Sequence, residues 1–243
     1  MVKACRKASK VLIRDFGEIE NLQVSVKGPG DFVTVSDKKV EKILIEELQK
    51  ARPDYSFLSE EAGEINFDSD SEYTWLIDPL DGTMNFARGF PVCCVSIALW
   101  MHAAPALGVI YDLNTCHMHV GVVGKGATTD GKEPMQVSDV DNPGQAVLAT
   151  GFPTGRSYEP NDLAEFIAKV RRFKKIRMIG SAAVSLANVA SGVWEVYHEE
   201  NVFLWDVAAG LALVEAAGGK VVYSKLSSEG TFNVTASNGR VTL

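Results

Sequence analysis

The chain has 243 residues, 46% of them hydrophobic, and a net charge of −7 from 24 lysines and arginines against 31 aspartates and glutamates. This length suits one large domain or two small ones, and the acidic balance argues against nucleic acid as the main partner. No apolar stretch approaches the roughly 20 residues of a membrane span, and the first residues lack the apolar core of a signal peptide. We therefore expect a soluble cytoplasmic protein that has no membrane partner.

The cysteines do not form the pattern of a disulfide-stabilised protein. Cys93 and Cys94 are neighbours in an apolar segment, so their side chains would lie on opposite faces of a strand. We expect them to be small core residues, as free cysteines often are.

Two amphipathic helices are predicted in the first 50 residues. The apolar positions are Ala4, Ala8, Val11 and Leu12 in the first helix, and Val40, Ile43, Leu44 and Leu48 in the second. Thr34 and Asp37 have the spacing of a capping box, so Asp37 is expected to stabilise the start of the second helix. A short strand at residues 57–59 follows, and it leads into the acidic pair Glu60 and Glu61.

The most informative stretch is residues 73–86. The apolar run from Tyr73 to Ile77 predicts a buried strand, which should end at Asp78 because Pro79 cannot donate to a sheet. Asp81 and Gly82 form a turn pair, and Thr83 can cap a following helix. Carboxylates suit Mg²⁺ and the amides at a helix start suit a phosphate, although the spacing alone fits a solvated strand-to-helix turn equally well.

Strands are expected next at residues 92–100, 106–111 and 118–123, with a tight turn at Asp130 and Gly131. His117 and His119 would lie on one face of the last of these strands. Two histidines could indicate a metal site, but exposed strand histidines are the favoured interpretation because no third ligand has a recognisable spacing.

Turn-forming residues between Asp139 and Gln145 suggest a boundary. We therefore divide the chain into an N-terminal half, 1–140, with the acidic motifs, and a C-terminal half, 141–243, that completes the site. The second half begins with a predicted strand at 147–150 and a helix that starts at Asn161 or Asp162. The apolar positions of this helix are Leu163, Phe166, Ile167 and Val170.

Basic residues follow in a group, namely Lys169, Arg171, Arg172, Lys174, Lys175 and Arg177. A solvated helix end is the favoured interpretation of this group, and an anion-binding or RNA-binding strip is the alternative. Gly180 and Ser181 should open a further helix. Glu199, Glu200 and Asn201 are expected in a loop, after which Asp206 would be the N-cap of a helix that ends at Gly218.

Three segments together resemble one enzyme family. They are Ser59-Glu60-Glu61, the run Trp-Leu-Ile-Asp-Pro-Leu-Asp-Gly-Thr-Met-Asn-Phe at 75–86, and Trp-Asp-Val-Ala-Ala-Gly at 205–210. In type, order and separation they resemble the motifs of the inositol monophosphatase family, which are lithium-sensitive, Mg²⁺-dependent phosphatases. The resemblance covers about residues 4–234. It implies an α/β fold, the layered αβαβα sandwich of inositol monophosphatases and fructose bisphosphatases, and a homodimer.

The resemblance also implies roles for individual residues. Two to three Mg²⁺ ions would bind to Glu60, Asp78, the Leu80 carbonyl, Asp81 and Asp206. Asp37 and Thr83 would activate the attacking water, and the amides of Gly82 and Thr83 would bind the phosphate. The inositol ring would contact Asp81, Ala182, Glu199 and Asp206.

These roles imply a Mg²⁺-dependent phosphatase that hydrolyses inositol monophosphate by direct attack of a metal-activated water. The alternatives are a phosphatase for another sugar phosphate, fructose bisphosphate or phosphoadenosine phosphate, and a transcription- or RNA-associated adaptor with secondary phosphatase activity. The chain departs from the family at Met84, where a threonine is usual, at Asn201, where a glycine is common, and in the apolar pair Phe203 and Leu204. Because two of these departures are close to Glu199, the substrate is the part of the function that stays open.

Overall fold

The computed structural model describes residues 1–16, 24–28, 31–65, 71–152, 159–226 and 230–243. For residues 24–28 and 31–34 it describes the backbone. The predicted capping role of the Thr34 side chain therefore lies outside the described residues.

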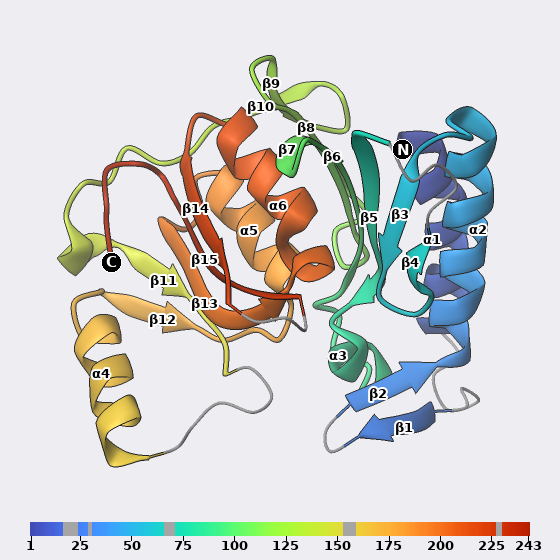
Figure 1. The fold of residues 1–243 in the computed structure, drawn as a ribbon. Helices are drawn as coiled ribbons and strands as arrows, with labels where there is room; N and C mark the ends of the chain where they lie inside the picture. The colour runs from blue at the N-terminus through green and yellow to red at the C-terminus, as the bar shows by residue number, and fades with distance from the viewer. Residues whose placement is uncertain (17–23, 29–30, 66–70, 153–158, 227–229) are drawn as a thin grey trace.

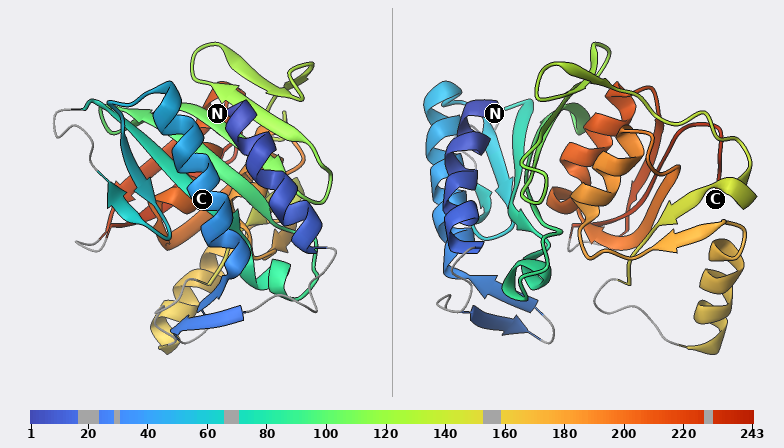
Figure 2. Two further views of the ribbon diagram at one scale, coloured as in Figure 1. Left: turned by 90° about the vertical axis from the view of Figure 1, so that its right-hand side faces the viewer. Right: turned by 180° about the vertical axis from the view of Figure 1, so that it is seen from behind.

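The elements are arranged in layers, and opposite views show the same order (Figures 1 and 2). Helices α1 and α2 cover one face of a large sheet, α5 and α6 lie between this sheet and a smaller one, and α4 flanks the smaller sheet beside β12. This confirms the predicted αβαβα sandwich. The helices are α1 Val2–Phe16, α2 Val35–Ala51, α3 Thr83–Ala87, α4 Pro160–Val170, α5 Ala182–Ala190 and α6 Leu204–Ala216, with a 3₁₀ turn at Pro143–Gln145.

The large sheet has eight strands in the order β10-β9-β8-β7-β6-β5-β3-β4, and all neighbours are antiparallel except β3 and β5. Its strands are β3 Ser56–Ser59, β4 Gly63–Ile65, β5 Tyr73–Asp81, β6 Cys94–Met101, β7 Ala104–Asp112, β8 Met118–Val122, β9 Gly126–Thr129 and β10 Glu133–Met135. The small sheet has the order β12-β11-β13-β15-β14. Its strands are β11 Val147–Ala149, β12 Lys175–Arg177, β13 Val196–Phe203, β14 Lys220–Lys225 and β15 Thr231–Ser237. A separate hairpin consists of β1 Val24–Gly28 and β2 Asp31–Thr34.

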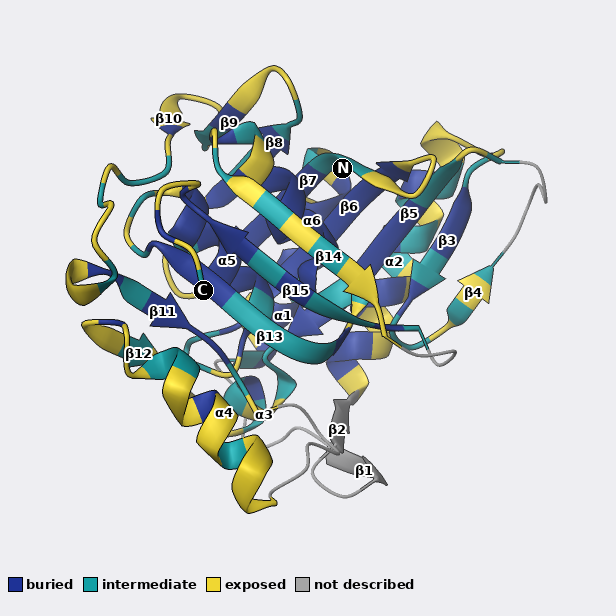
Figure 3. Ribbon diagram, turned by 60° about the vertical axis from the view of Figure 1, so that its left-hand side comes forward, coloured by how far each residue is buried: buried dark blue, intermediate teal, exposed yellow. Residues whose placement is uncertain are grey.

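Each face of the large sheet has its own hydrophobic core. Cys93 packs into the core under α1 and α2, whereas Cys94 packs into the core around α5 and α6, and both thiols are unoxidised. The expected alternation of these neighbours is therefore confirmed. Helix α6 is buried from Val207 to Val214, where its ribbon in Figure 3 is dark blue, because it lies between the two sheets.

Two glycines allow α6 to lie unusually close to the large sheet. Gly108 of β7 and Gly121 of β8 are direct cross-strand partners. A Cβ atom on Gly108 would be 2.2 Å from the Ala209 carbonyl oxygen, and one on Gly121 would be 2.9 Å from the Leu213 Cα. The helix thus lies over a strip of sheet that has no side chains, and its approach leaves no room for a side chain at either position.

The predicted end of the central strand is wrong. Strand β5 continues through Pro79 to Asp81, and its register with β6 shifts between Asp78 and Asp81. A bulge needs no ladder bond from the inserted residues, so the missing N–H of proline is tolerated there.

The predicted start of α4 is also wrong, because the helix begins at Pro160 with Glu159 as its N-cap. Proline is favoured at the first helical position, where its missing N–H has no partner to lose. Ile167, which was expected to be buried, is 56% exposed. Among the basic residues, Lys169 belongs to α4, whereas Lys175–Arg177 form β12, the outermost strand of the small sheet.

The tight turn expected at Asp130 and Gly131 is present. Asp130 and Gly131 both have positive φ, 53° and 69°, as a tight turn between β9 and β10 requires. Within the described residues, no helix combines the length and apolar composition needed to cross a membrane.

Candidate active site

The acidic residues of the first two motifs lie side by side on the large sheet. Strands β3 and β5 are parallel neighbours, and the Glu60 N–H continues their ladder by donating to the Ile77 carbonyl at 3.2 Å. Leu58 and Leu76 both pack on the α5–α6 side of the sheet. Because residues two apart in a strand share a face, Glu60 and Asp78 point toward the same helical layer.

The third motif brings Asp206 to this place from α6. Burial raises the pKa of Asp206 well above its ordinary value, and the charges of Asp81 and Glu60 raise it further. Asp78 shows the same direction, because burial and then the charges of Glu60, Asp81 and Asp206 raise its pKa. Four carboxylates from distant parts of the chain therefore repel one another, and two of them, Asp78 and Asp81, are buried.

The sequence suggested that Asp206 is the N-cap of α6, and this prediction is wrong. Phe203 is the N-cap and Asp206 is the third helical residue. The Asp206 carboxylate accepts a hydrogen bond from the Phe203 N–H, as the third residue of a capping box does. It still stabilises the helix start, but from within the first turn.

Asp81 is held by the first turn of α5. Its Oδ2 atom accepts from the Ser181 hydroxyl at 2.6 Å and from the Ala183 N–H at 2.7 Å. Burial raises the pKa of Asp81 to about 6, and these hydrogen bonds oppose the shift. Ser181 is also the N-cap of α5, as expected, since it accepts from the Val184 N–H.

The turn after β5 contains Gly82 and Thr83. Gly82 has φ 88° and is the N-cap of α3, and a Cβ atom there would be 2.7 Å from the Val92 carbonyl oxygen. The capping role predicted for Thr83 is wrong, because Thr83 is itself the first helical residue. Its hydroxyl donates to the Leu80 carbonyl at 2.8 Å, which brings two of the predicted site residues together. Asp37 is buried in the first turn of α2, and its pairing with Thr83 stays a prediction.

A cavity of about 250 Å³ adjoins the carboxylates. All four residues predicted to contact a sugar line it, namely Asp81, Ala182, Glu199 and Asp206. Sequence reasoning missed other residues that line the cavity, among them Thr150, Gly151, Phe152 and Ser185. No local signal marks the first three, because they reach the cavity only when β11 lies beside β13.

Glu199 belongs to strand β13 and not to the predicted loop. The register of β13 with β15 shifts between Glu199 and Val202, and Asn201 in the bulge has φ 61°. Asparagine tolerates this left-handed conformation better than most residues, so it can replace a glycine here. The Tyr197 hydroxyl donates to Glu199 Oε2 at 3.0 Å, and a Cβ atom on Gly151 would be 2.4 Å from Glu199 Oε1.

Comparison with known proteins agrees with this geometry. The sequence profile described as the inositol monophosphatase family matches residues 1–242. The chain belongs to the inositol monophosphatase family. It is 42% identical to a protein named inositol-1-monophosphatase from Mesorhizobium japonicum, over 91% of this chain and 83% of that protein. It is 40% identical to a protein named Nus factor SuhB from Xylella fastidiosa, over 91% of this chain and 79% of that protein.

The fold is similar to that of a solved family structure, the extragenic suppressor protein SuhB from Bartonella henselae. The TM-score is 0.86 at 38% identity, and the match covers 99% of this chain and 93% of that chain. The chain is therefore a phosphoric monoester hydrolase, and its family is generally metal-dependent.

The residues present fit the metal ions that the inositol monophosphatase family implies. Four carboxylates and a carbonyl are an all-oxygen donor set, which suits Mg²⁺, and a cation would relieve their mutual repulsion. In the described parts of the chain, no three His, Cys, Asp or Glu side chains already converge as a metal site. Asp81 instead faces α5, and the Asp78 Oδ1 atom accepts from the Leu80 N–H at 2.9 Å.

Two buried polar residues beside the acidic residues of the candidate site were missed from the sequence. Glu41 is buried on α2, where its Oε1 atom accepts from the Ser59 hydroxyl and, at 3.1 Å each, from the N–H groups of Glu61 and Ala62. A charge at position 41, within the apolar stripe of that helix, could have revealed it. Ser96 is directly opposite Asp78, and its buried hydroxyl has no hydrogen-bond partner among the described residues.

Proposed function

We propose that this protein is a Mg²⁺-dependent phosphatase that hydrolyses inositol monophosphate to inositol and phosphate. The observation that carries the proposal is the set of four mutually repelling carboxylates, of which Asp78 and Asp81 are buried, beside a cavity of about 250 Å³. Membership of a family of phosphoric monoester hydrolases supports it, as does the name of the relative from Mesorhizobium japonicum.

Glu60, Asp78, Asp81, Asp206 and the Leu80 carbonyl would hold two to three Mg²⁺ ions. Bound there, the ions would lower the pKa of water and stabilise the leaving oxygen. The chain itself supplies the amides of Gly82 and Thr83 for the phosphate.

The proton of the attacking water needs a route, for which we propose the Thr83 hydroxyl and the Asp37 carboxylate. Glu199 and the first turn of α5, at Ala182, would orient the hydroxyl groups of the sugar. Asp81 and Asp206 would contribute to both the metal and the sugar contacts. The wall formed by Gly151 and Phe152 would limit the size of the substrate.

The test is a phosphate-release assay across inositol phosphates, fructose bisphosphate, phosphoadenosine phosphate and an aryl phosphate. We expect inositol monophosphate to be preferred, with Mg²⁺ required and Li⁺ inhibitory. Asp206→Asn should remove most activity, whereas Asp162→Asn, a change of the same chemistry at an exposed position of α4, should not. Full activity after exhaustive chelation would contradict the proposal.

A second candidate function is a role in transcription, which the relative named Nus factor SuhB favours. The basic residues that could bind RNA are partly engaged, since Lys169 forms ion pairs with Glu165 and Glu200 at 3.2 and 2.8 Å. RNA binding at low salt that is lost in a Lys174→Gln, Lys175→Gln, Arg177→Gln variant would support this candidate, and no binding by the parent would remove it. The homodimer and the cytoplasmic location stay predictions.

A further inference from the structure

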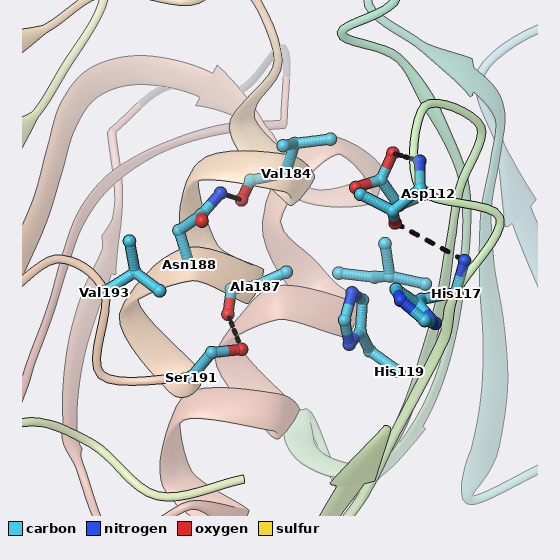
Figure 4. A pocket seen from close by; sticks show the side chains of 10 residues that line it. Asp112, His117, His119, Val184, Ala187, Asn188, Ser191 and Val193 are labelled. Carbon is cyan, nitrogen blue, oxygen red and sulfur yellow. Dashed lines mark hydrogen bonds between the residues drawn. The ribbon is translucent and has the colours of Figure 1, made fainter. Parts of the chain in front are cut away.

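A second cavity, of about 140 Å³, lies between the β7–β8 turn and the C-terminal end of α5 (Figure 4). The sheet contributes Asp112, His117 and His119 to its wall, and α5 contributes Asn188 and the following Ser191. The opposite end of α5 holds Asp81. The two cavities have no lining residue in common, so this cavity is distinct from the candidate active site.

The two histidines face the same way. Met118 between them is buried in the core under α1 and α2, so strand alternation places His117 and His119 on the α5 side of the sheet. Figure 4 shows both imidazoles on the sheet side of the cavity, across from Ala187 and Ser191. Residues two apart along a strand are separated by ~6.6 Å, a span that two imidazoles can close around one ion.

Both imidazoles are held through Nδ1. His117 Nδ1 is 2.7 Å from Asp130 Oδ2, and His119 Nδ1 is 3.0 Å from Thr129 Oγ1. Across the described residues, no hydrogen bond involves Nε2 of either ring. The Asp130 carboxylate can only accept, so a neutral His117 carries its proton on Nδ1 and has a lone pair on Nε2, and the Thr129 hydroxyl can accept from His119 Nδ1 in the same way. An imidazole oriented by a carboxylate in this way is typical of metal-bound histidine.

The surroundings favour a cation over an anion. Asp112 is paired across the strands with His117, since its N–H donates to the His117 carbonyl at 3.0 Å, and its side chain lines the cavity. The C-terminal end of α5 adds the negative end of its dipole. Among the described residues that line the cavity there is no lysine or arginine.

We propose that His117 and His119 form a binding site for a first-row transition-metal dication such as Ni²⁺ or Zn²⁺. The protein supplies two imidazole nitrogens, and water fills the other positions, because no three potential ligands of the described chain are already gathered at one point. Imidazole selects these ions over Mg²⁺, which prefers oxygen, so the site is independent of the candidate active site.

Paramagnetic Ni²⁺ tests this site directly in the Mg²⁺-loaded wild-type protein. The chain has four histidines, at 102, 117, 119 and 198, so its imidazole NMR spectrum contains two candidate ligands and two internal controls. Less than one equivalent of Ni²⁺ should broaden the ring signals of His117 and His119, and leave those of His102 and His198 sharp. Equal broadening of all four signals, or of none, would overturn the proposal.

Binding affinities provide the second measurement. His117→Gln and His119→Gln should each weaken Ni²⁺ binding by at least ~10-fold, and Asp130→Asn by ~10–100-fold, the usual effect of losing the group that orients a ligand. His102→Gln is the matched control, because His102 is 3.4 Å from a carboxylate oxygen, of Glu72, but has no second imidazole beside it in the sequence. Cys116→Ser tests whether the exposed thiol next to His117 takes part. Unchanged affinity in His119→Gln, or equal loss in His102→Gln, would refute the site.

Discussion

The Thr83 hydroxyl has two competing roles at the candidate active site. In the structure it donates to the Leu80 carbonyl at 2.8 Å, whereas the proposed proton relay requires it to donate to Asp37. Since one hydroxyl has one proton, it must turn away from Leu80 when the relay operates. Variants of the two residues can distinguish a relay from simple support of the carbonyl.

If Thr83 and Asp37 act together, Thr83→Ala should lower kcat by ~10²–10⁴, the usual contribution of a general base. Thr83→Ser should retain much of the rate because it keeps the hydroxyl, and Asp37→Asn should resemble Thr83→Ala. Steady-state kinetics of the double variant decide the matter, since residues that act as one unit show little further loss. Additive losses would show two separate roles.

Glu199 should determine substrate preference, because it lines the cavity and its carboxylate is fixed by the Tyr197 hydroxyl. Glu199→Gln should reduce kcat/KM for inositol phosphate more than for a featureless aryl phosphate. The difference should be about 1.5–3 kcal/mol, the value of a charged hydrogen bond. Glu200→Gln is the matched control, since Glu200 pairs with Lys169 of α4. Equal losses of Glu199→Gln on both substrates would contradict the assignment.

At the scale of elements, the contact between α6 and the glycines of β7 and β8 should control the position of Asp206. Gly108→Ala would place a methyl group 2.2 Å from the Ala209 carbonyl oxygen, so the helix must move. Overpacking of this kind costs about 1–3 kcal/mol of unfolding free energy. We expect a lower Tm together with weaker Mg²⁺ binding by the folded protein, measured by calorimetry.

Gly144→Ala is a suitable control for this prediction. Its Cβ atom would be 3.3 Å from the Asn142 side chain, in a short 3₁₀ turn that does not line the cavity. A lower Tm of Gly108→Ala with normal Mg²⁺ affinity would show that α6 does not set the geometry of the carboxylates.

Apolar periodicity predicted most helices and strands, but it failed where a strand passes through an irregularity. From the sequence, Pro79 and Asn201 each suggest that no strand continues there. In the structure, the pairing of β5 with β6 continues beyond Pro79, and that of β13 with β15 continues beyond Asn201. Whether a strand continues depends on its neighbour, which lies far away in the chain. For the same reason the motifs indicated the carboxylates, whereas the cavity wall at Thr150–Phe152 had no signal of its own.

At the scale of the whole molecule, the buried carboxylates should link stability to pH. The pKa of Asp81 is raised to about 6, and those of Asp78 and Asp206 are raised well above the ordinary value near 4. At a pH between the ordinary pKa and the raised pKa values, the metal-free folded protein binds more protons than the unfolded chain. Its unfolding free energy therefore contains a contribution that falls as the pH rises through this range.

Thermal unfolding with a chelator, between pH 4.5 and 7.5, should reveal this contribution. Asp78→Asn should gain stability over the wild type as the pH rises, because it lacks one of the buried charges. Mg²⁺ should stabilise the wild type most at the upper end of the range, where the carboxylates are ionised. Parallel pH curves for the wild type and Asp78→Asn would exclude the linkage.

The outermost strand β12 has a consequence for behaviour in concentrated solution. An open sheet edge can pair with another molecule, and short length together with exposed positive charge discourages this. β12 has three residues, and Lys175 and Arg177 are exposed. The Lys174→Gln, Lys175→Gln, Arg177→Gln variant should therefore aggregate more readily in light scattering, although its net charge is more negative. The phosphatase activity of this variant should stay within a few-fold of normal. Together these results would show that the cations at β12 prevent self-association and take no part in catalysis.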